Sequence, residues 1–96
     1  MEGYSIGMMA KSLAGHDKGK IYLIAGVDET YVYLVDGKYR TMNRPKRKKI
    51  KHVQIDYNIP EWIQSLIKKG KPVQDSDVIK VRREYGRKLD VKGRCY

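Results

Sequence analysis

The sequence predicts a mainly β protein with helices at its C-terminal end. From Ile6 to about Val53, short apolar stretches are separated by glycine and aspartate, which is typical of a small antiparallel β structure. After Asn58 the apolar residues change to the three- and four-residue spacing of amphipathic helices. A chain of 96 residues has material for one compact core. We therefore expect a β unit over residues 1–56 and a helical extension over residues 57–96 that packs on it.

The strands are predicted from alternation and from turn residues. Residues 21–27 alternate as in a strand with one face inside and the other partly covered, and residues 28–30 then supply a turn. The strand over residues 31–35 follows. A fifth short strand is predicted over residues 49–54, with Ile50 and either His52 or Val53 closing the β structure.

The turn after residues 31–35 is predicted to be a two-residue hairpin. Asp36 and Gly37 form a dipeptide that tolerates positive φ at both positions. Such a turn pairs Val35 with Lys38, Leu34 with Tyr39 and Tyr33 with Arg40. Val32, Leu34 and Tyr39 would then share one face.

Two helices are predicted after the β unit. Pro60 suits a first helical turn, and Gly70 ends that helix. Asp75 or Ser76 caps the second helix. The tail from Asp90 to Tyr96 has no periodicity and is expected to fray. The recurring apolar positions are Ile59, Ile63, Leu66 and Ile67 in the first helix and Val78, Val81, Tyr85 and Leu89 in the second.

The charge of the chain indicates a polyanionic partner. Lys and Arg number 21 against 11 Asp and Glu, which gives a formal net charge of +10. RNA, DNA and an anionic membrane surface all attract such a charge.

The apolar run over residues 21–27 is too short to span a bilayer, and the first eleven residues do not resemble a secretion signal. Cys95 is the one cysteine, so neither an internal disulfide nor a zinc site of thiolates can form. We expect a cytoplasmic protein with no membrane partner.

The segment Leu13 to Lys20 is a candidate phosphate-binding loop. Gly15 and Gly19 allow backbone conformations closed to other residues, and Asp17 can cap the turn. Exposed backbone N–H groups, together with Lys18 and Lys20, could contact phosphates. The alternative is an ordinary glycine-rich hairpin turn.

A basic run in the middle of the chain is the stronger signal for nucleic-acid binding. No acidic residue lies between Asp36 and Asp56, so nothing nearby in the sequence neutralises it. A localisation signal or a solvated charged loop are the alternatives. The basic residues of the run are Arg44, Lys46, Arg47, Lys48, Lys49 and Lys51.

The exposed aromatic residues have two interpretations. Tyr31, Tyr33 and Arg40 could stack on unpaired bases. We favour the alternative that the tyrosines pack against an appended helix, and we expect Trp62 to be a packing anchor.

No catalytic or metal-binding motif is apparent. His16 and His52 lie far apart in the sequence, and no nucleophile, base and orienting group can be assembled around either. The carboxylate pairs Asp28 with Glu29 and Asp75 with Asp77 stand where turns and helix starts use acids. We expect a protein that is not an enzyme and has no metal or cofactor.

Taken together, the loop over residues 14–20, the segment 31–38 and the basic run ending at Val53 resemble bacterial KOW-domain proteins related to large-subunit ribosomal proteins of archaea and eukaryotes. The resemblance covers about the first 55 residues, and the helices resemble the C-terminal extension of the same group. It implies a small five-stranded SH3-like barrel followed by two short α-helices. It also implies non-catalytic binding of ribosomal or other structured RNA. These proteins often carry Arg or Lys where this chain has His16, so the loop has less positive charge here.

The leading hypothesis is a ribosome-associated RNA-binding protein that is a monomer when free and also contacts ribosomal proteins. The alternative is a KOW-type interaction module that contacts the transcription or translation machinery. A duplex DNA binder is less favoured, because no helix-turn-helix arrangement is evident. The candidate RNA-binding residues are Gly15, His16, Lys18, Gly19, Lys20, Tyr33, Arg40, Arg44, Lys46, Arg47, Lys48, Lys49 and Lys51.

Overall fold

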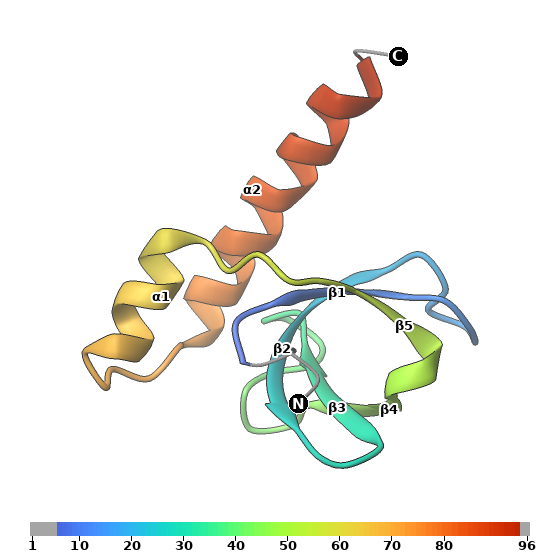
Figure 1. The fold of residues 1–96 in the computed structure, drawn as a ribbon, viewed down its shortest axis with the longest axis horizontal. Helices are drawn as coiled ribbons and strands as arrows, with labels where there is room; N and C mark the ends of the chain where they lie inside the picture. The colour runs from blue at the N-terminus through green and yellow to red at the C-terminus, as the bar shows by residue number, and fades with distance from the viewer. Residues whose placement is uncertain (1–5, 95–96) are drawn as a thin grey trace.

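The computed structural model describes the backbone of residues 6–94 and the side chains of residues 6–86. Five strands form one antiparallel sheet, and two α-helices follow it in the chain (Figure 1). This confirms the predicted mainly β fold with C-terminal helices. The strands are β1 (Met9–Ser12), β2 (Ile21–Val27), β3 (Tyr31–Val35), β4 (Lys46–Lys49) and β5 (Val53–Asp56). The helices are the short 3-10 helix η1 (Ile50–His52), α1 (Glu61–Lys68) and α2 (Asp75–Arg94).

The sheet is curved but open. Its strand order is β4-β3-β2-β1-β5, so the two edge strands are the pair joined by η1. The N–H of Ile50 donates to the carbonyl of Thr30, and the N–H of Leu13 donates to the carbonyl of His52, each at 2.9 Å. Both ends of η1 are thereby fixed to the rest of the sheet. No ladder joins β4 to β5 in the part of the chain that the structure describes.

The predicted hairpin at Asp36 and Gly37 is wrong. Leu34 pairs with Lys46 and Tyr33 with Arg47, so a long loop separates β3 from β4. Gly37 has the expected positive φ of 83°, but the φ of Asp36 is not positive. Among the described residues, only glycines have a positive φ.

The physical reason lies in the carboxylate of Asp36. One of its oxygens accepts the backbone N–H groups of Lys38, Tyr39 and Arg40 at 2.8 to 2.9 Å, which opens the turn into a wider loop. Tyr39 is therefore 74% exposed and does not share a face with Val32 and Leu34, as had been expected.

The strand predicted over residues 49–54 is also wrong in its bounds. The basic residues Lys46 to Lys49 are themselves a strand, and η1 separates them from β5. A run of lysine and arginine is a poor strand by propensity, so tertiary pairing with β3 overrides the local preference here.

Two apolar clusters lie on the two faces of the sheet. Alternation along β2 places Tyr22 and Ile24 in the inner core, which lies inside the curved sheet. It places Leu23 in the helix-covered cluster, which lies between the sheet and the helices. Both faces of β2 are thus buried at Tyr22, Leu23 and Ile24, while Val27 at its end is 41% exposed. The helical extension packs on the sheet through Ile63 of α1 and Val78 of α2, both fully buried.

The helices begin within about one residue of the predicted positions, but α2 starts at Asp75 itself, and the Asp75 carboxylate accepts the N–H of Met42 at 2.8 Å. Pro60 precedes α1, and Gly70 after it has a φ of 71°. Trp62 packs against the helix-covered cluster, and its Nε1–H donates to Glu84 at 3.0 Å, which confirms its role as an anchor.

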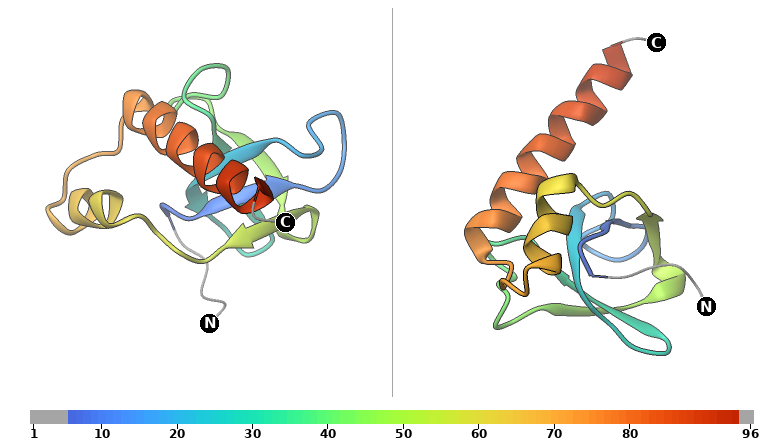
Figure 2. Two further views of the ribbon diagram at one scale, coloured as in Figure 1. Left: turned by 90° about the horizontal axis from the view of Figure 1, so that it is seen from above. Right: turned by 60° about the vertical axis from the view of Figure 1, so that its left-hand side comes forward.

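Helix α2 is longer than expected. It continues to Arg94, so the frayed tail predicted from Asp90 is helical as far as the described chain goes, while Cys95 and Tyr96 lie outside it. Its C-terminal part projects beyond the sheet (Figure 2). No helix in residues 6–94 has the length and apolar character needed to cross a membrane.

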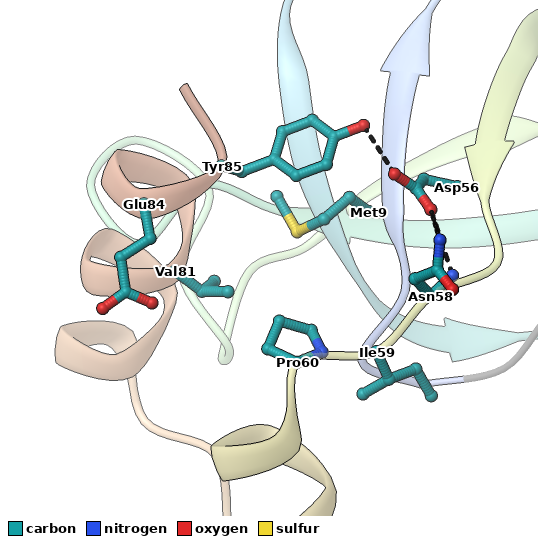
Figure 3. Close-up of a pocket in the computed structure, with 8 residues that line it drawn as sticks. All are labelled: Met9, Asp56, Asn58, Ile59, Pro60, Val81, Glu84 and Tyr85. Carbon is teal, nitrogen blue, oxygen red and sulfur yellow. Dashed lines mark hydrogen bonds between the residues drawn. The ribbon is translucent and has the colours of Figure 1, made fainter. Parts of the chain in front are cut away.

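Two hydrogen bonds fix α2 to the sheet. Arg82 Nε donates to the carbonyl of Ile21 at 2.8 Å, and the Tyr85 hydroxyl donates to Asp56 at 3.0 Å. Burial, followed by the bond to Asp56, raises the pKa of Tyr85 to about 12. A cavity lies beside this bond, between α2 and the connection from β5 to α1 (Figure 3).

Candidate nucleic-acid interface

The glycine-containing loop has the backbone that the sequence predicts. Gly15 and Gly19 have φ angles of 86° and 90°, in the left-handed region that favours glycine. The N–H of Gly19 donates to the carbonyl of Ser12 at 2.8 Å, and that of Ser12 donates to the carbonyl of Lys20 at 2.9 Å. The loop is therefore a closed hairpin between β1 and β2. His16 and Lys18 are exposed at its tip.

We expect Gly19→Val to lower the free energy of unfolding by roughly 1–3 kcal/mol, because a β-branched residue resists this φ angle. A Cβ at Gly19 would have no atom within 4 Å, so the loss comes from the backbone alone. Gly86→Ala is the control. This glycine lies inside α2 with open space around it, so the substitution should stabilise by about 0.5–1 kcal/mol. Urea unfolding measures both, and equal midpoints for Gly19→Val and the parent would contradict the strain argument.

Asp17, in the same loop, is the centre of a buried polar cluster. Its carboxylate accepts Lys46 Nζ at 2.7 Å and Lys48 Nζ at 2.8 Å, both from β4. The hydroxyls of Ser12 and Tyr22 each donate to it at 2.7 Å. The Asp17 and Lys48 side chains are only 10% exposed. The loop and β4, distant in the sequence, are thus joined by charge-assisted hydrogen bonds.

The cluster changes how two of its members ionise. Burial opposes ionisation of Asp17, but the hydrogen bonds from Lys46, Lys48, Tyr22 and Ser12 outweigh it and hold the pKa of Asp17 far below its ordinary value. Burial and the neighbouring Asp17 carboxylate raise the pKa of Tyr22 above its ordinary value. Asp17 therefore stays ionised and Tyr22 stays a neutral hydrogen-bond donor at neutral pH.

Lys20 is also paired inside the fold. Its Nζ lies 2.7 Å from the buried carboxylate of Asp36. Burial raises the pKa of Asp36, but Lys20 and the three backbone donors more than offset this, so the pKa is well below its usual range. Three of the candidate RNA-binding lysines, Lys20, Lys46 and Lys48, thus carry charges that carboxylates of the fold already compensate.

The alternation of β4 separates the basic run into two sets. Lys46 and Lys48 lie opposite the core residues Leu34 and Val32, and therefore share the inner face of the sheet with them. Arg47 and Lys49 lie opposite Tyr33 and Tyr31 on the outer face and are exposed.

Tyr31 and Tyr33 have different surroundings from those expected. Both are on the same face of β3 as Val35, but the helix-covered cluster includes Val35 and neither tyrosine. The favoured interpretation, packing against an appended helix, is therefore wrong. Tyr33 lies over Gly26, where an added Cβ would be 3.4 Å from its ring, and Arg47 stacks on Tyr31 at 4.4 Å from the ring centre.

Two hollows meet at Tyr31. The first joins the glycine loop to β4 and the end of η1, and is lined by Ala14, Gly15, Tyr31, Lys46, Arg47, Lys48, Lys49 and His52. The second lies beside the turn between β2 and β3, and is lined by Glu29, Thr30, Tyr31, Lys49, Ile50 and Lys51. Lys49 and Tyr31 are common to both.

The fold brings together only part of the predicted site. Of the predicted residues, those that line the two hollows are Gly15, Lys46, Arg47, Lys48, Lys49 and Lys51. Arg40 and Arg44 are exposed but lie in the loop between β3 and β4 and line neither hollow. Sequence reasoning missed the stacking of Arg47 on Tyr31, and it assigned Asp17 only to the turn. The signal that could have been used is the alternation of side chains along residues 46–49. It places Lys46 and Lys48 on one face of the strand and Arg47 and Lys49 on the other.

The cavity beside Tyr85 differs in charge from these two hollows. Asp56 and Glu84 line it together with apolar residues (Figure 3), so it does not suit a phosphate. Within the described residues there is no group of three His, Cys, Asp or Glu side chains that could hold a metal ion. No family model matches the chain, and no curated protein matches it.

Proposed function

We propose that this protein is a non-catalytic RNA-binding protein of the KOW type, with a sheet related to the SH3-like barrel, that associates with the ribosome. The observation that carries the proposal is the outer face of β4 and η1. Arg47, Lys49 and Lys51 line a continuous pair of hollows beside the glycine loop. No carboxylate pairs with these three residues in the part of the chain that the structure describes.

Free positive charge on an exposed strand edge is the chemistry that phosphates require. A lysine already bonded to a buried carboxylate contributes little net attraction, since its charge is compensated. Arg47, Lys49 and Lys51 have no such carboxylate partner among the described residues. They occupy every second position along β4 and η1. Contacts to phosphates position the protein on RNA and give slight sequence preference.

Affinity for a structured RNA should fall steeply with salt. If about four phosphates are engaged, raising monovalent salt from about 50 to about 200 mM should weaken binding on the order of a hundredfold. Fluorescence anisotropy with a labelled ribosomal RNA stem-loop measures this. A nearly flat response would remove the electrostatic mechanism and favour a protein-interaction module.

The dependence of binding on salt should also be visible in cell extracts. In sucrose gradients of a native lysate, the protein should migrate with ribosomal particles at low salt and leave them as salt is raised. Sedimentation at the top of the gradient at every salt concentration would contradict the ribosomal part of the proposal.

A further inference from the structure

The second hollow has the construction of a pocket for one flat, uncharged group. Its volume is about 560 Å³, within the usual range for ligand sites. Tyr31 and Ile50 are among the residues that line it, and Ile50 also packs on the inner core. The carbonyl of Thr30 accepts the N–H of Ile50 at 2.9 Å, which joins the two segments that line the hollow.

The Tyr31 ring has one occupied face. Arg47 lies 4.4 Å from the ring centre and lines the first hollow, but it does not line the second. Tyr31 is therefore reached from the second hollow, which Arg47 does not line. A planar group in this hollow would lie against Tyr31, and aromatic side chains hold unpaired nucleobases by stacking.

The rim of this pocket is charged asymmetrically. Lys49 and Lys51 come from β4 and η1, Glu29 comes from the turn between β2 and β3, and all three are exposed. Phosphates would lie on the lysine side, because Glu29 repels them. The carboxylate of Glu29 accepts hydrogen bonds only, so it suits the amino or imino edge of a base.

We propose that the pocket beside Tyr31 receives one unpaired RNA base, which stacks on the Tyr31 ring while Lys49 and Lys51 bind the flanking phosphates. The inference rests on the proposed RNA-binding function and names its substrate class. A base in a duplex is already stacked and cannot enter a pocket, so the preferred RNA carries a bulged or looped-out nucleotide.

The test compares two stem-loop RNAs that differ by one unpaired 2-aminopurine in the stem. The parent protein should bind the bulged RNA about tenfold more tightly than the fully paired RNA, or by about 1.4 kcal/mol, because only the bulged RNA offers a base that can stack on the aromatic ring. Binding should also change the 2-aminopurine fluorescence. Tyr31→Leu should remove both the preference and the fluorescence change, so that the ratio of the two affinities falls to about one.

Two further variants test whether the preference requires an aromatic ring at position 31. Tyr31→Phe keeps the ring and should keep the preference. Tyr39→Leu removes a tyrosine that is 74% exposed and lines neither hollow, and should also keep it. Thermal unfolding of each variant separates a lost pocket from a lost fold.

The outcomes distinguish this inference from the proposed function. Equal binding of both RNAs by the parent, with a steep salt dependence, would overturn the base pocket and leave RNA binding in place. Equal loss of both RNAs in a folded Tyr31→Leu variant would make Tyr31 a structural residue and also overturn the pocket. Binding of neither RNA would refute the proposed function and the inference with it.

Discussion

Replacing Arg44, Arg47, Lys49 and Lys51 by Gln should reduce affinity for structured RNA on the order of a hundredfold or more at low salt. It should also lower the slope of log K against log salt by about three to four, since each phosphate contact contributes close to one unit. All four side chains are exposed or paired only with a ring face, so folding should be preserved. Anisotropy titrations across a salt series give both quantities.

A second quadruple variant provides the matched control. Lys68, Lys69, Lys71 and Arg83 are exposed in α1, the segment after it and α2, and replacing them by Gln removes the same charge. Net charge and long-range steering are then equal in the two variants. The control should lose affinity only modestly. Equal losses would mean diffuse electrostatics without a defined site, and a larger loss in the control would move the RNA-binding face to the helices.

Asp17→Asn should destabilise the protein by about 3–5 kcal/mol, the usual result of removing one partner from a buried charge pair. The substitution leaves Lys46 and Lys48 near each other without a carboxylate, in a cluster where Asp17 is only 10% exposed. Small domains have a total stability of roughly 5–15 kcal/mol, so the effect should be plain in urea unfolding. Asp28→Asn, at an exposed aspartate, is the control and should change stability little.

Removing the charges together should recover part of the loss. In Asp17→Asn combined with Lys46→Met and Lys48→Met, no buried charge remains unpaired, and such replacements are often neutral. A triple variant no more stable than Asp17→Asn would show that packing in the cluster, not charge balance, accounts for the destabilisation.

The Asp17 cluster and the separate pair of Lys20 with Asp36 make stability depend on pH. The folded pKa values of Asp17 and Asp36 are depressed below the ordinary carboxyl value near 4. Their contribution to stability is therefore fully present above about pH 5 and is lost as the pH falls through and below the ordinary value. The parent should unfold more readily in acid, while Asp17→Asn should show a shallower loss over the same range.

Local patterns in the sequence were sufficient to predict the positions of some strands and helices. Alternation located β2 and β3, and the three- and four-residue spacing located α1 and the start of α2, because these signals depend on neighbours in the chain. Gly15 and Gly19 were also predictable, since a tight turn requires positive φ where glycine is favoured. The Asp36 and Gly37 turn was not, because a side chain that binds three backbone N–H groups competes with the hairpin pattern.

The candidate site divides in the same way. The sequence by itself determined that the chain is strongly basic, that its positive charge is densest before β5, and that a glycine-containing loop precedes β2. The tertiary structure alone decided which of those charges are free. Lys46 and Lys48 reach Asp17 across 29 and 31 positions of the chain, and Arg47 reaches Tyr31 because β4 pairs with β3. Alternation assigns a residue to one side of its own strand, but only the curvature and pairing of the whole sheet determine what that side contacts.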